Sequence, residues 1–280
     1  MVQSILLLSS KINILVISGF SRLTILGTGH VAWAIGMALK QAGHSVVQVF
    51  GRDNARTMEL ANALDAQPVV NLTDLAPDSD VFILAVSDDA IFDLVNSLPA
   101  VRGMVVHTSA SVSMEVIKER FSGCGVLYPL QTLSRNRKSN LSDVPFFVEA
   151  ADENQLLQLT RFASTITSHV IHADSDTRRK YHLAAIFACN FVNHMYSIAS
   201  DYLTAQGLRP ELLGPLMEET AAKAIELGAA ASQTGPALRD DSQTMQRHIE
   251  MLRYLPEYQN LYSLMSTLIQ QFHNKPDDQL

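Results

Sequence analysis

The stretch Leu-Thr-Ile-Leu-Gly-Thr-Gly-His-Val-Ala, residues 23–32, decides the fold of the first half of the chain. Four apolar or β-prone residues end at Gly27, and a helical pattern follows the second glycine. In this G-x-G-x-x-A motif the first glycine permits a tight turn, the second admits a phosphate to the backbone, and the small last position lets the helix pack on the sheet. The motif predicts a dinucleotide-binding turn made by Gly27, Thr28, Gly29, His30 and Val31. A glycine turn without a ligand is the alternative.

Short apolar strands and helices alternate from Arg22 to about Ala173. Residues 81–86 form an unbroken apolar run, which is typical of a strand buried on both faces of a parallel sheet. The alternation predicts an α/β fold with right-handed crossovers and a doubly wound parallel sheet, the Rossmann arrangement. The predicted strands are 23–26, 46–50, 69–70, 81–86, 104–107, 125–128, 146–149 and 170–173, with helices that include 57–64 and 154–164.

After Ala173 the pattern contains helices only, at 174–204, 210–231, 241–254 and 257–273. The sequence therefore predicts a dinucleotide-binding domain over 22–173 and an all-α domain over 174–280, which binds substrate and forms a dimer. The first of these helices is apolar on every face, and this predicts that it is buried. At 100° per residue its polar side chains lie on an arc of about 160°; they are Lys180, His182, Asn190, Asn193 and His194.

Residues 1–21 form an N-terminal extension in this interpretation. Their apolar runs are interrupted by Ser9, Ser10 and Lys11, so no run reaches the roughly 18–20 residues of a membrane-spanning helix. The first basic residue, Lys11, follows the first apolar run, whereas a secretory signal has its basic residues before that run. We therefore expect neither an anchor nor a signal here.

The composition excludes several classes of protein. Lys and Arg number 21 against 28 Asp and Glu, a net charge of −7, which argues against a protein that binds nucleic-acid backbones. Apolar residues make up 47%, too many for a disordered chain. Charged residues make up only 18%, against about 25% in ordinary domains, so we expect surface hidden in an oligomer. The two cysteines, Cys124 and Cys189, have no metal-binding spacing and predict a reducing, cytoplasmic location.

Gly51-Arg52-Asp53 follows the second predicted strand, where an NAD-selective site has a carboxylate for the ribose. Gly51 occupies that place, and the guanidinium of Arg52 suits a 2′-phosphate, with Arg56 in reach to assist. We therefore predict NADP as the cofactor. A shift of one or two residues would instead make Asp53 the ribose acceptor, which favours NAD.

Two polar segments follow later strands at the same predicted edge of the sheet. Val86, Ser87 and Asp88 are candidates for the ribose beside the nicotinamide, although Ser87 or Asp88 can also cap the next helix. The segment His107-Thr108-Ser109-Ala110-Ser111 places Ser109 either in a cleft wall or in a turn whose hydroxyls bind backbone. No serine has a convincing nearby His–Asp pair for nucleophilic catalysis.

Near the C-terminus, Asp241, Thr244 and His248 have i, i+3, i+7 spacing and share one helix face. Asp241 is a candidate helix cap. With Arg239 these residues form a polar patch suited to an anionic substrate or a partner subunit. The alternative is a capped surface helix that carries a histidine by chance.

Several motifs together carry a family resemblance. They are Gly27-Thr28-Gly29, His107-Thr108-Ser109, Tyr128-Pro129-Leu130-Gln131-Thr132, Lys180-Tyr181-His182 with Asn190, and Thr234-Gly235-Pro236 with Arg239, Asp241, Thr244 and His248. In these the chain resembles Rossmann-like NADP oxidoreductases of unassigned substrate, whose helical C-terminal domain is a domain of unknown function. That family is related to pyrroline-5-carboxylate reductase, the β-hydroxyacid dehydrogenases and the deazaflavin-dependent NADP reductases.

The resemblance covers nearly everything after Arg22 and implies a homodimer formed through the helical domain. Ala110 and Asp240 stand where the family usually has glycine, so we expect both loops to differ in backbone geometry.

Two functional hypotheses remain open. The first is an NADP(H)-dependent oxidoreductase acting on a small carbonyl or imine, with no metal, nucleic acid or membrane involved. His182 and Asn190 would donate to the reacting atom, Lys180 would meet a carboxylate or phosphate, and Ser109 and Tyr128 would line the cleft. The second is a non-catalytic NADP(H)-binding sensor or assembly protein, in which these polar groups are satisfied structural side chains.

Overall fold

The computed structural model describes residues 19–135 and 140–274. The chain divides into two compact units between Asn190 and Phe191, and each unit is described by itself. The predicted N-terminal extension lies outside the described residues except for residues 19–21. No helix in the described part of the chain is long and apolar enough to cross a membrane.

The first unit is built on an eight-stranded sheet with the order β3-β2-β1-β4-β5-β6-β7-β8. Neighbouring strands from β3 through β6 are parallel, and their order matches the dinucleotide-binding sheet, which confirms the predicted fold class. The strands are β1 (Arg22–Leu26), β2 (Ser45–Phe50), β3 (Gln67–Val69), β4 (Val81–Leu84), β5 (Met104–His107), β6 (Cys124–Pro129), β7 (Phe146–Ala150) and β8 (Val170–His172).

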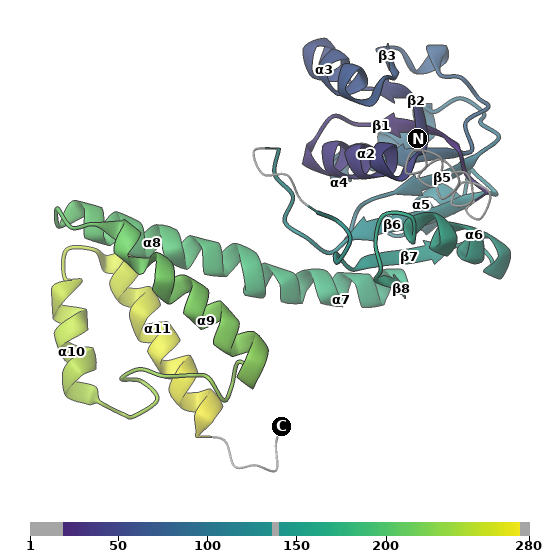
Figure 1. The fold of residues 1–280 in the computed structure, drawn as a ribbon. Helices are drawn as coiled ribbons and strands as arrows, with labels where there is room; N and C mark the ends of the chain where they lie inside the picture. The colour runs from purple at the N-terminus through teal and green to yellow at the C-terminus, as the bar shows by residue number, and fades with distance from the viewer. Residues whose placement is uncertain (1–18, 136–139, 275–280) are drawn as a thin grey trace, which may run out of the picture. The chain divides into compact units, whose positions relative to one another are not determined.

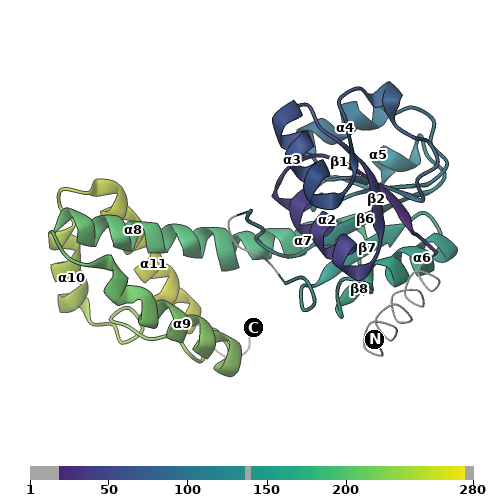
Figure 2. The same ribbon diagram turned by 45° about the horizontal axis from the view of Figure 1, so that its top comes forward.

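Helices cover both faces of this sheet (Figures 1 and 2). They are α2 (His30–Ala42), α3 (Asn54–Leu64), α4 (Asp88–Ser97), α5 (Glu115–Lys118) and α6 (Glu153–Ala163), with a 3₁₀ turn at Leu72–Asp74. Val81 and Ile83 of β4 join the core under α2, α3 and α6, whereas Phe82 and Leu84 join the core under α4 and α5. Burial on both faces is the reason for the unbroken apolar run in this strand.

The sheet is mostly parallel, as a doubly wound fold predicts, and the pair β6–β7 is antiparallel. The described residues between these strands contain no helix, and the chain turns back alongside β6 rather than crossing over the sheet. The helix α6 then provides a crossover, and β8 is parallel to β7.

Helical residues run without interruption from Ser175 to Ala205. This segment comprises α7 (Ser175–Ala185), a π-helical segment (Ile186–Phe191) and α8 (Val192–Ala205). The prediction that this helix is buried is wrong for the single chain, because Arg178 is the only buried residue of α7. Leu183 and Phe187 are 61% and 62% exposed. The apolar residues all round the helix therefore reflect surface that the chain itself leaves uncovered.

The second unit continues with a 3₁₀ turn (Pro210–Leu213), α9 (Gly214–Leu227), α10 (Ser242–Met251) and α11 (Pro256–His273). In Figures 1 and 2, α8 lies across the group formed by α9, α10 and α11. The helix α9 ends earlier than predicted because Gly228 has a φ of +84°, outside the helical region.

Candidate functional site

A cavity of about 960 Å³ opens at the carboxyl ends of β1, β2 and β4. This edge is where ligands bind in open α/β sheets. The predicted cofactor residues all line the cavity except Asp88. The lining also includes residues that were not predicted, notably Phe50, Leu72, Ala85, Asp93, Leu94 and Ser97.

The glycine turn has the shape that a phosphate requires. Gly27 has a φ of +120°, and a Cβ at this position would lie 2.1 Å from the carbonyl oxygen of Ala85, so only glycine fits. A Cβ on Gly29 would meet nothing within 4 Å, so the backbone faces open space at this point of the cavity lining. Within the described part of the chain no side chain caps α2, so its first N–H groups suit a phosphate.

Gly51 brings the end of β2 close to this turn. A Cβ at Gly51 would lie 2.4 Å from Oγ1 of Thr57 and 2.7 Å from Cγ2 of Thr28. The carboxylate that an NAD site places here therefore has no room, which explains why the position after β2 holds glycine.

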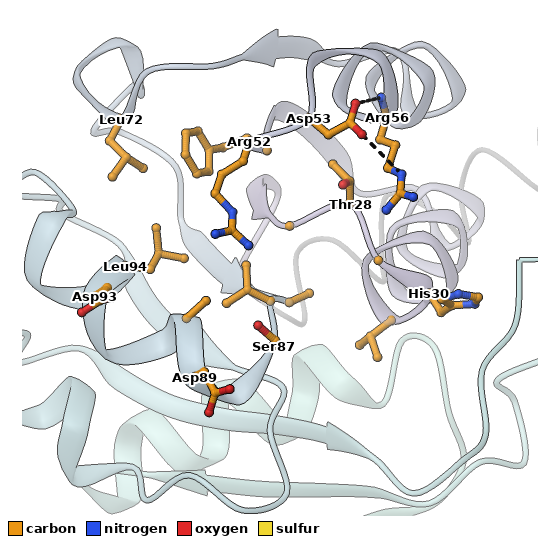
Figure 3. Close-up of a pocket in the computed structure, with 18 of the residues that line it drawn as sticks. Thr28, His30, Arg52, Asp53, Arg56, Leu72, Ser87, Asp89, Asp93 and Leu94 are labelled. Carbon is orange, nitrogen blue, oxygen red and sulfur yellow. Dashed lines mark hydrogen bonds and ion pairs between the residues drawn. The ribbon is translucent and has the colours of Figure 1, made fainter.

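Arg52 and Asp53 have different roles. Arg52 points its guanidinium into the cavity (Figure 3) and has no ion pair among the described residues. Asp53 caps α3, since its Oδ1 accepts a hydrogen bond of 3.1 Å from the backbone N–H of Arg56, and its Oδ2 lies 3.5 Å from Nε of Arg56. Asp53 is thus engaged by its own helix, which favours Arg52 as the residue that reads the cofactor.

The helix α4 forms the opposite wall through Asp89, Ala90, Asp93 and Leu94 (Figure 3). The sequence analysis named cavity residues only up to the first turn of this helix. The later lining residues, up to residue 97, recur at helical spacing and lie on the same helix face, which was the signal for them. Ser87 occupies the N-cap position of α4, but its side chain makes no capping hydrogen bond, so the alternative that Ser87 serves as a helix cap is not supported.

The segment after β5 is a tight turn. Ser109 is buried, and its Oγ accepts hydrogen bonds of 3.0 Å from the backbone N–H groups of Ser111 and Val112. Nδ1 of His107 accepts a 3.1 Å bond from the N–H of Ser109. Burial, assisted by the nearby charge of Arg178, lowers the pKa of His107 to about 3, so this imidazole is neutral near pH 7. Ser109 and His107 therefore shape the turn.

A buried ion pair holds α7 to the sheet, and sequence reasoning missed it. Arg178 has no exposed surface and donates to Oε2 of Glu149 at 2.6 Å and to the carbonyl of Val112 at 2.7 Å. Ser175 donates to the same Oε2 at 2.9 Å. The sequence did contain one indication of this ion pair. Glu149 directly follows the apolar run Phe146–Val148, and a carboxylate at the end of a buried strand needs a partner for its charge.

One turn further along α7, His182 meets Tyr128. The hydroxyl oxygen of Tyr128 lies 3.2 Å from Nδ1 of His182, and the Tyr128 ring stacks on Phe147. Burial raises the pKa of Tyr128 and outweighs the nearby charge of Arg178, which lowers it, so the hydroxyl keeps its proton. A Tyr128 hydroxyl that donates to Nδ1 leaves the proton of His182 on Nε2, where it can be given to a ligand.

Lys180 and Asn190 lie elsewhere on the same helical segment. Nζ of Lys180 pairs with Asp176 at 2.6 Å, and the Lys180 side chain is 75% exposed. Asn190 is exposed and falls in the π-helical segment. A π-helix has more residues per turn than an α-helix, so the predicted arc of about 160°, which assumes 100° per residue, does not hold across it. Such segments occur frequently at functional sites.

In the predicted polar patch of the second unit, the structure confirms the helix cap at Asp241. Oδ1 of Asp241 accepts a 3.0 Å bond from the N–H of Thr244, which caps α10 and lowers the pKa of Asp241. Nδ1 of His248 lies 2.8 Å from the hydroxyl of Tyr262 on α11. Arg239 is exposed.

Of the two residues that stand where the family usually has glycine, Asp240 has an unfavourable backbone conformation. Asp240 has a φ of +52°, in the left-handed region that favours glycine, and its Oδ1 accepts a bond from Gln270 at 2.8 Å. Ala110 has no positive φ and is buried.

Among the described residues, no group of three or more His, Cys, Asp or Glu is placed to hold a metal ion. Comparison with known families matches residues 17–132 to a Rossmann-like domain and residues 144–269 to a domain of unknown function, DUF2520. No protein with a curated description matches the chain.

Three solved structures illustrate the relationship. A Bacteroides fragilis protein described as a "putative NADP oxidoreductase" is 35% identical, with a TM-score of 0.87 over 91% of this chain and 99% of its own. An imine reductase from Myxococcus stipitatus in complex with NADP⁺ is 16% identical, with a TM-score of 0.62 over 89% and 93% of the two chains. A pyrroline-5-carboxylate reductase from Coxiella burnetii is 18% identical, with a TM-score of 0.56 over 92% and 100%. The last two share the fold.

Proposed function

The chain belongs to the family that joins a Rossmann-like domain to a DUF2520 domain, and we propose that it is an NADP(H)-dependent oxidoreductase acting on a small carbonyl or imine. The observation that carries the proposal is the cavity at the glycine turn, into which Arg52 points. The Bacteroides relative, named for NADP chemistry, supports the same assignment.

The residues present fit NADP. The open backbone at Gly29 and the uncapped start of α2 receive the pyrophosphate. Arg52 pairs with the 2′-phosphate, which a guanidinium binds with two parallel hydrogen bonds. Val86 and Ser87 line the cavity at the end of β4, where they would contact the second ribose. The reduced cofactor supplies a hydride when it is bound.

The polar groups of the segment 175–191 serve the substrate in this proposal. Hydride transfer makes the acceptor oxygen or nitrogen negative, and a nearby donor stabilises that charge. When the Tyr128 hydroxyl donates to Nδ1 of His182, the proton on Nε2 of His182 is left to donate to the substrate. Asn190 provides a second donor, while Lys180, paired with Asp176, is better placed to meet a carboxylate or phosphate than the reacting atom.

A first test is NADPH oxidation across a panel of small keto acids, aldehydes, ketones and cyclic imines. We expect at least one class to be reduced with saturation kinetics. If the protein binds NADPH but oxidises it with no member of the panel, the sensor or assembly hypothesis replaces this one.

Cofactor choice gives a sharper prediction. We expect NADPH to bind at least about tenfold more tightly than NADH, a difference of about 1.4 kcal/mol. Arg52→Ala should abolish most of this preference and leave the NADH affinity nearly unchanged, because the lost contact is to the 2′-phosphate alone. Arg161→Ala is the matched control, since Arg161 is exposed on α6 and does not line the cavity. Equal NADPH and NADH titration curves for the parent protein would refute the role of Arg52.

We further propose a homodimer formed through the helical region. Large apolar side chains there are exposed in the single chain, among them Leu183, Phe187, Leu216 and Ile225 at 61%, 62%, 62% and 86%. Patches of this kind mark interaction surfaces. Light scattering at micromolar concentration should give about twice 30.8 kDa. Phe187→Glu should shift the mass to that of a monomer, whereas Phe92→Glu, at an equally exposed position on α4, should not. A monomeric parent protein would exclude the dimer.

A further inference from the structure

His30 is the first residue of α2 and directly follows the glycine turn (Figure 3). Its neighbours Gly29 and Val31 line the cofactor cavity with it. The glycine motif explains how the backbone N–H groups of this turn meet a pyrophosphate, but it gives the side chain at residue 30 no role. His30 is exposed, so a ligand in the cavity has access to its imidazole ring.

A hydrogen bond from a segment distant in sequence fixes the tautomer of His30. The backbone N–H of Arg135 donates to Nδ1 of His30 at 3.1 Å. A backbone N–H can only donate, so Nδ1 carries no proton in this arrangement, and the proton of the neutral ring is on Nε2. Nε2 has no hydrogen-bond partner among the described residues. His30 therefore presents an N–H donor at the cavity that the described part of the chain does not use.

The segment that carries Arg135 is anchored to two helices beside the cavity. Nη2 of Arg135 pairs with Oε1 of Glu59 on α3 at 2.6 Å. The Arg135 guanidinium also lies 4.6 Å from the centre of the Trp33 ring on α2. The Arg135 side chain is only 28% exposed, so both contacts are partly shielded from water. These contacts hold the Arg135 backbone next to His30.

We propose that His30 donates a hydrogen bond from Nε2 to the pyrophosphate of the cofactor, and that Arg135 and Glu59 are positioning residues for this donor. The start of α2 is where the pyrophosphate lies in such folds. Its oxygens are charged and only accept hydrogen bonds, and a bond to a charged acceptor is about twice as strong as one between neutral groups. The inference rests on the NADP site of the proposed function and requires no turnover.

Calorimetric titrations of the full-length protein separate this contact from that of Arg52. We expect His30→Ala to weaken NADPH and NADH by the same factor, about tenfold, because both cofactors carry the pyrophosphate. Adenosine 2′-monophosphate keeps the 2′-phosphate but lacks the pyrophosphate, so it should bind the parent and His30→Ala equally. The matched control is His169→Ala, which removes an exposed histidine outside the cavity and should change none of the three affinities.

Two amide variants test where the donor must lie. The side-chain amide nitrogen of glutamine extends about as far from the backbone as Nε2 of histidine, whereas that of asparagine ends near the position of Nδ1. His30→Gln should therefore recover part of the lost NADPH affinity, and His30→Asn should not. Equal losses in the two variants would contradict a donor at the Nε2 position, because both carry the same polar group.

The tautomer is tested by NMR of protein labelled with ¹⁵N in its histidines, since the chemical shift of an imidazole nitrogen shows whether it carries a proton. The His30 signals are assigned from His30→Gln. In mildly alkaline solution we expect the proton on Nε2, and we expect this N–H signal to move when NADPH is added. Arg135→Ala, which removes the contacts with Glu59 and Trp33, should populate the other tautomer and weaken NADPH less than His30→Ala does.

Three results would each overturn this proposal alone. They are a ring proton on Nδ1 of His30, NADPH binding to His30→Ala as tight as to the parent, and a loss of adenosine 2′-monophosphate binding as large as the loss of NADPH binding. Thermal unfolding shows that each variant is folded. If the parent protein binds no NADPH, the nucleotide site and this proposal fail together.

Discussion

Glu149→Gln should lower the free energy of unfolding by about 3–5 kcal/mol, because it leaves the guanidinium of Arg178 buried without its charge partner. Arg178 has no exposed surface, and its other bonds go to a carbonyl and a hydroxyl, neither of which neutralises its charge. The measurement is urea-induced unfolding of the parent and variant proteins.

The matched control is Asp176→Asn on the same helix, which breaks the exposed ion pairs with Arg179 and Lys180. We expect this change to lower the free energy of unfolding by less than about 1 kcal/mol, because exposed ion pairs contribute little to stability. The double variant Arg178→Met with Glu149→Met should be more stable than Glu149→Gln, since no unpaired charge remains. If Glu149→Gln loses no more unfolding free energy than the control Asp176→Asn, the ion pair between Glu149 and Arg178 does not hold α7 to the sheet.

Turnover should fall by about 10²-fold or more in His182→Ala and in Asn190→Ala, while the NADPH affinity stays unchanged. In the proposed mechanism, these variants remove donors to the reacting atom. Both residues belong to unit 1 but lie outside the lining of the cofactor cavity, so the contacts to the nucleotide stay intact. Tyr128→Phe should reduce turnover less, because it removes only the group that orients His182.

The control for these variants is His169→Ala, which removes an exposed histidine of the same unit. Initial rates with a substrate from the panel are compared with NADPH titrations of each variant. If both His182→Ala and Asn190→Ala turn over at the parent rate, these side chains are structural.

The fold could be predicted largely because local and global signals agree. The glycine turn at residue 27, the apolar run at 81–86 and the alternation of strands and helices all indicate the doubly wound sheet that the structure has. The strand β7 was predicted, at 146–149, but its antiparallel direction was not, because the sequence of an apolar strand does not show which way the strand runs.

The candidate site could be predicted where a motif has a fixed backbone geometry, as at Gly27, Gly29 and Arg52. It could not be predicted where partners are distant in sequence. Glu149 and Arg178 are 29 positions apart, and His182 meets Tyr128 across 54 positions. The polar arc was predicted with a uniform rotation of 100° per residue, which does not apply across the π-helical segment. Nothing in the residues Ile186–Phe191 indicates the extra residue per turn.

Transfer of deuterium from NADPH labelled at the nicotinamide C4 position tests the central claim most directly, with the product analysed by mass spectrometry. The claim that this chain reduces a carbonyl or imine predicts a product that carries one deuterium on the former carbonyl or imine carbon. His182→Ala should lower the rate of labelling without changing how tightly the labelled cofactor binds. Tight binding of NADPH with no deuterium in any member of the panel would contradict the claim and leave a nucleotide-binding protein without catalysis.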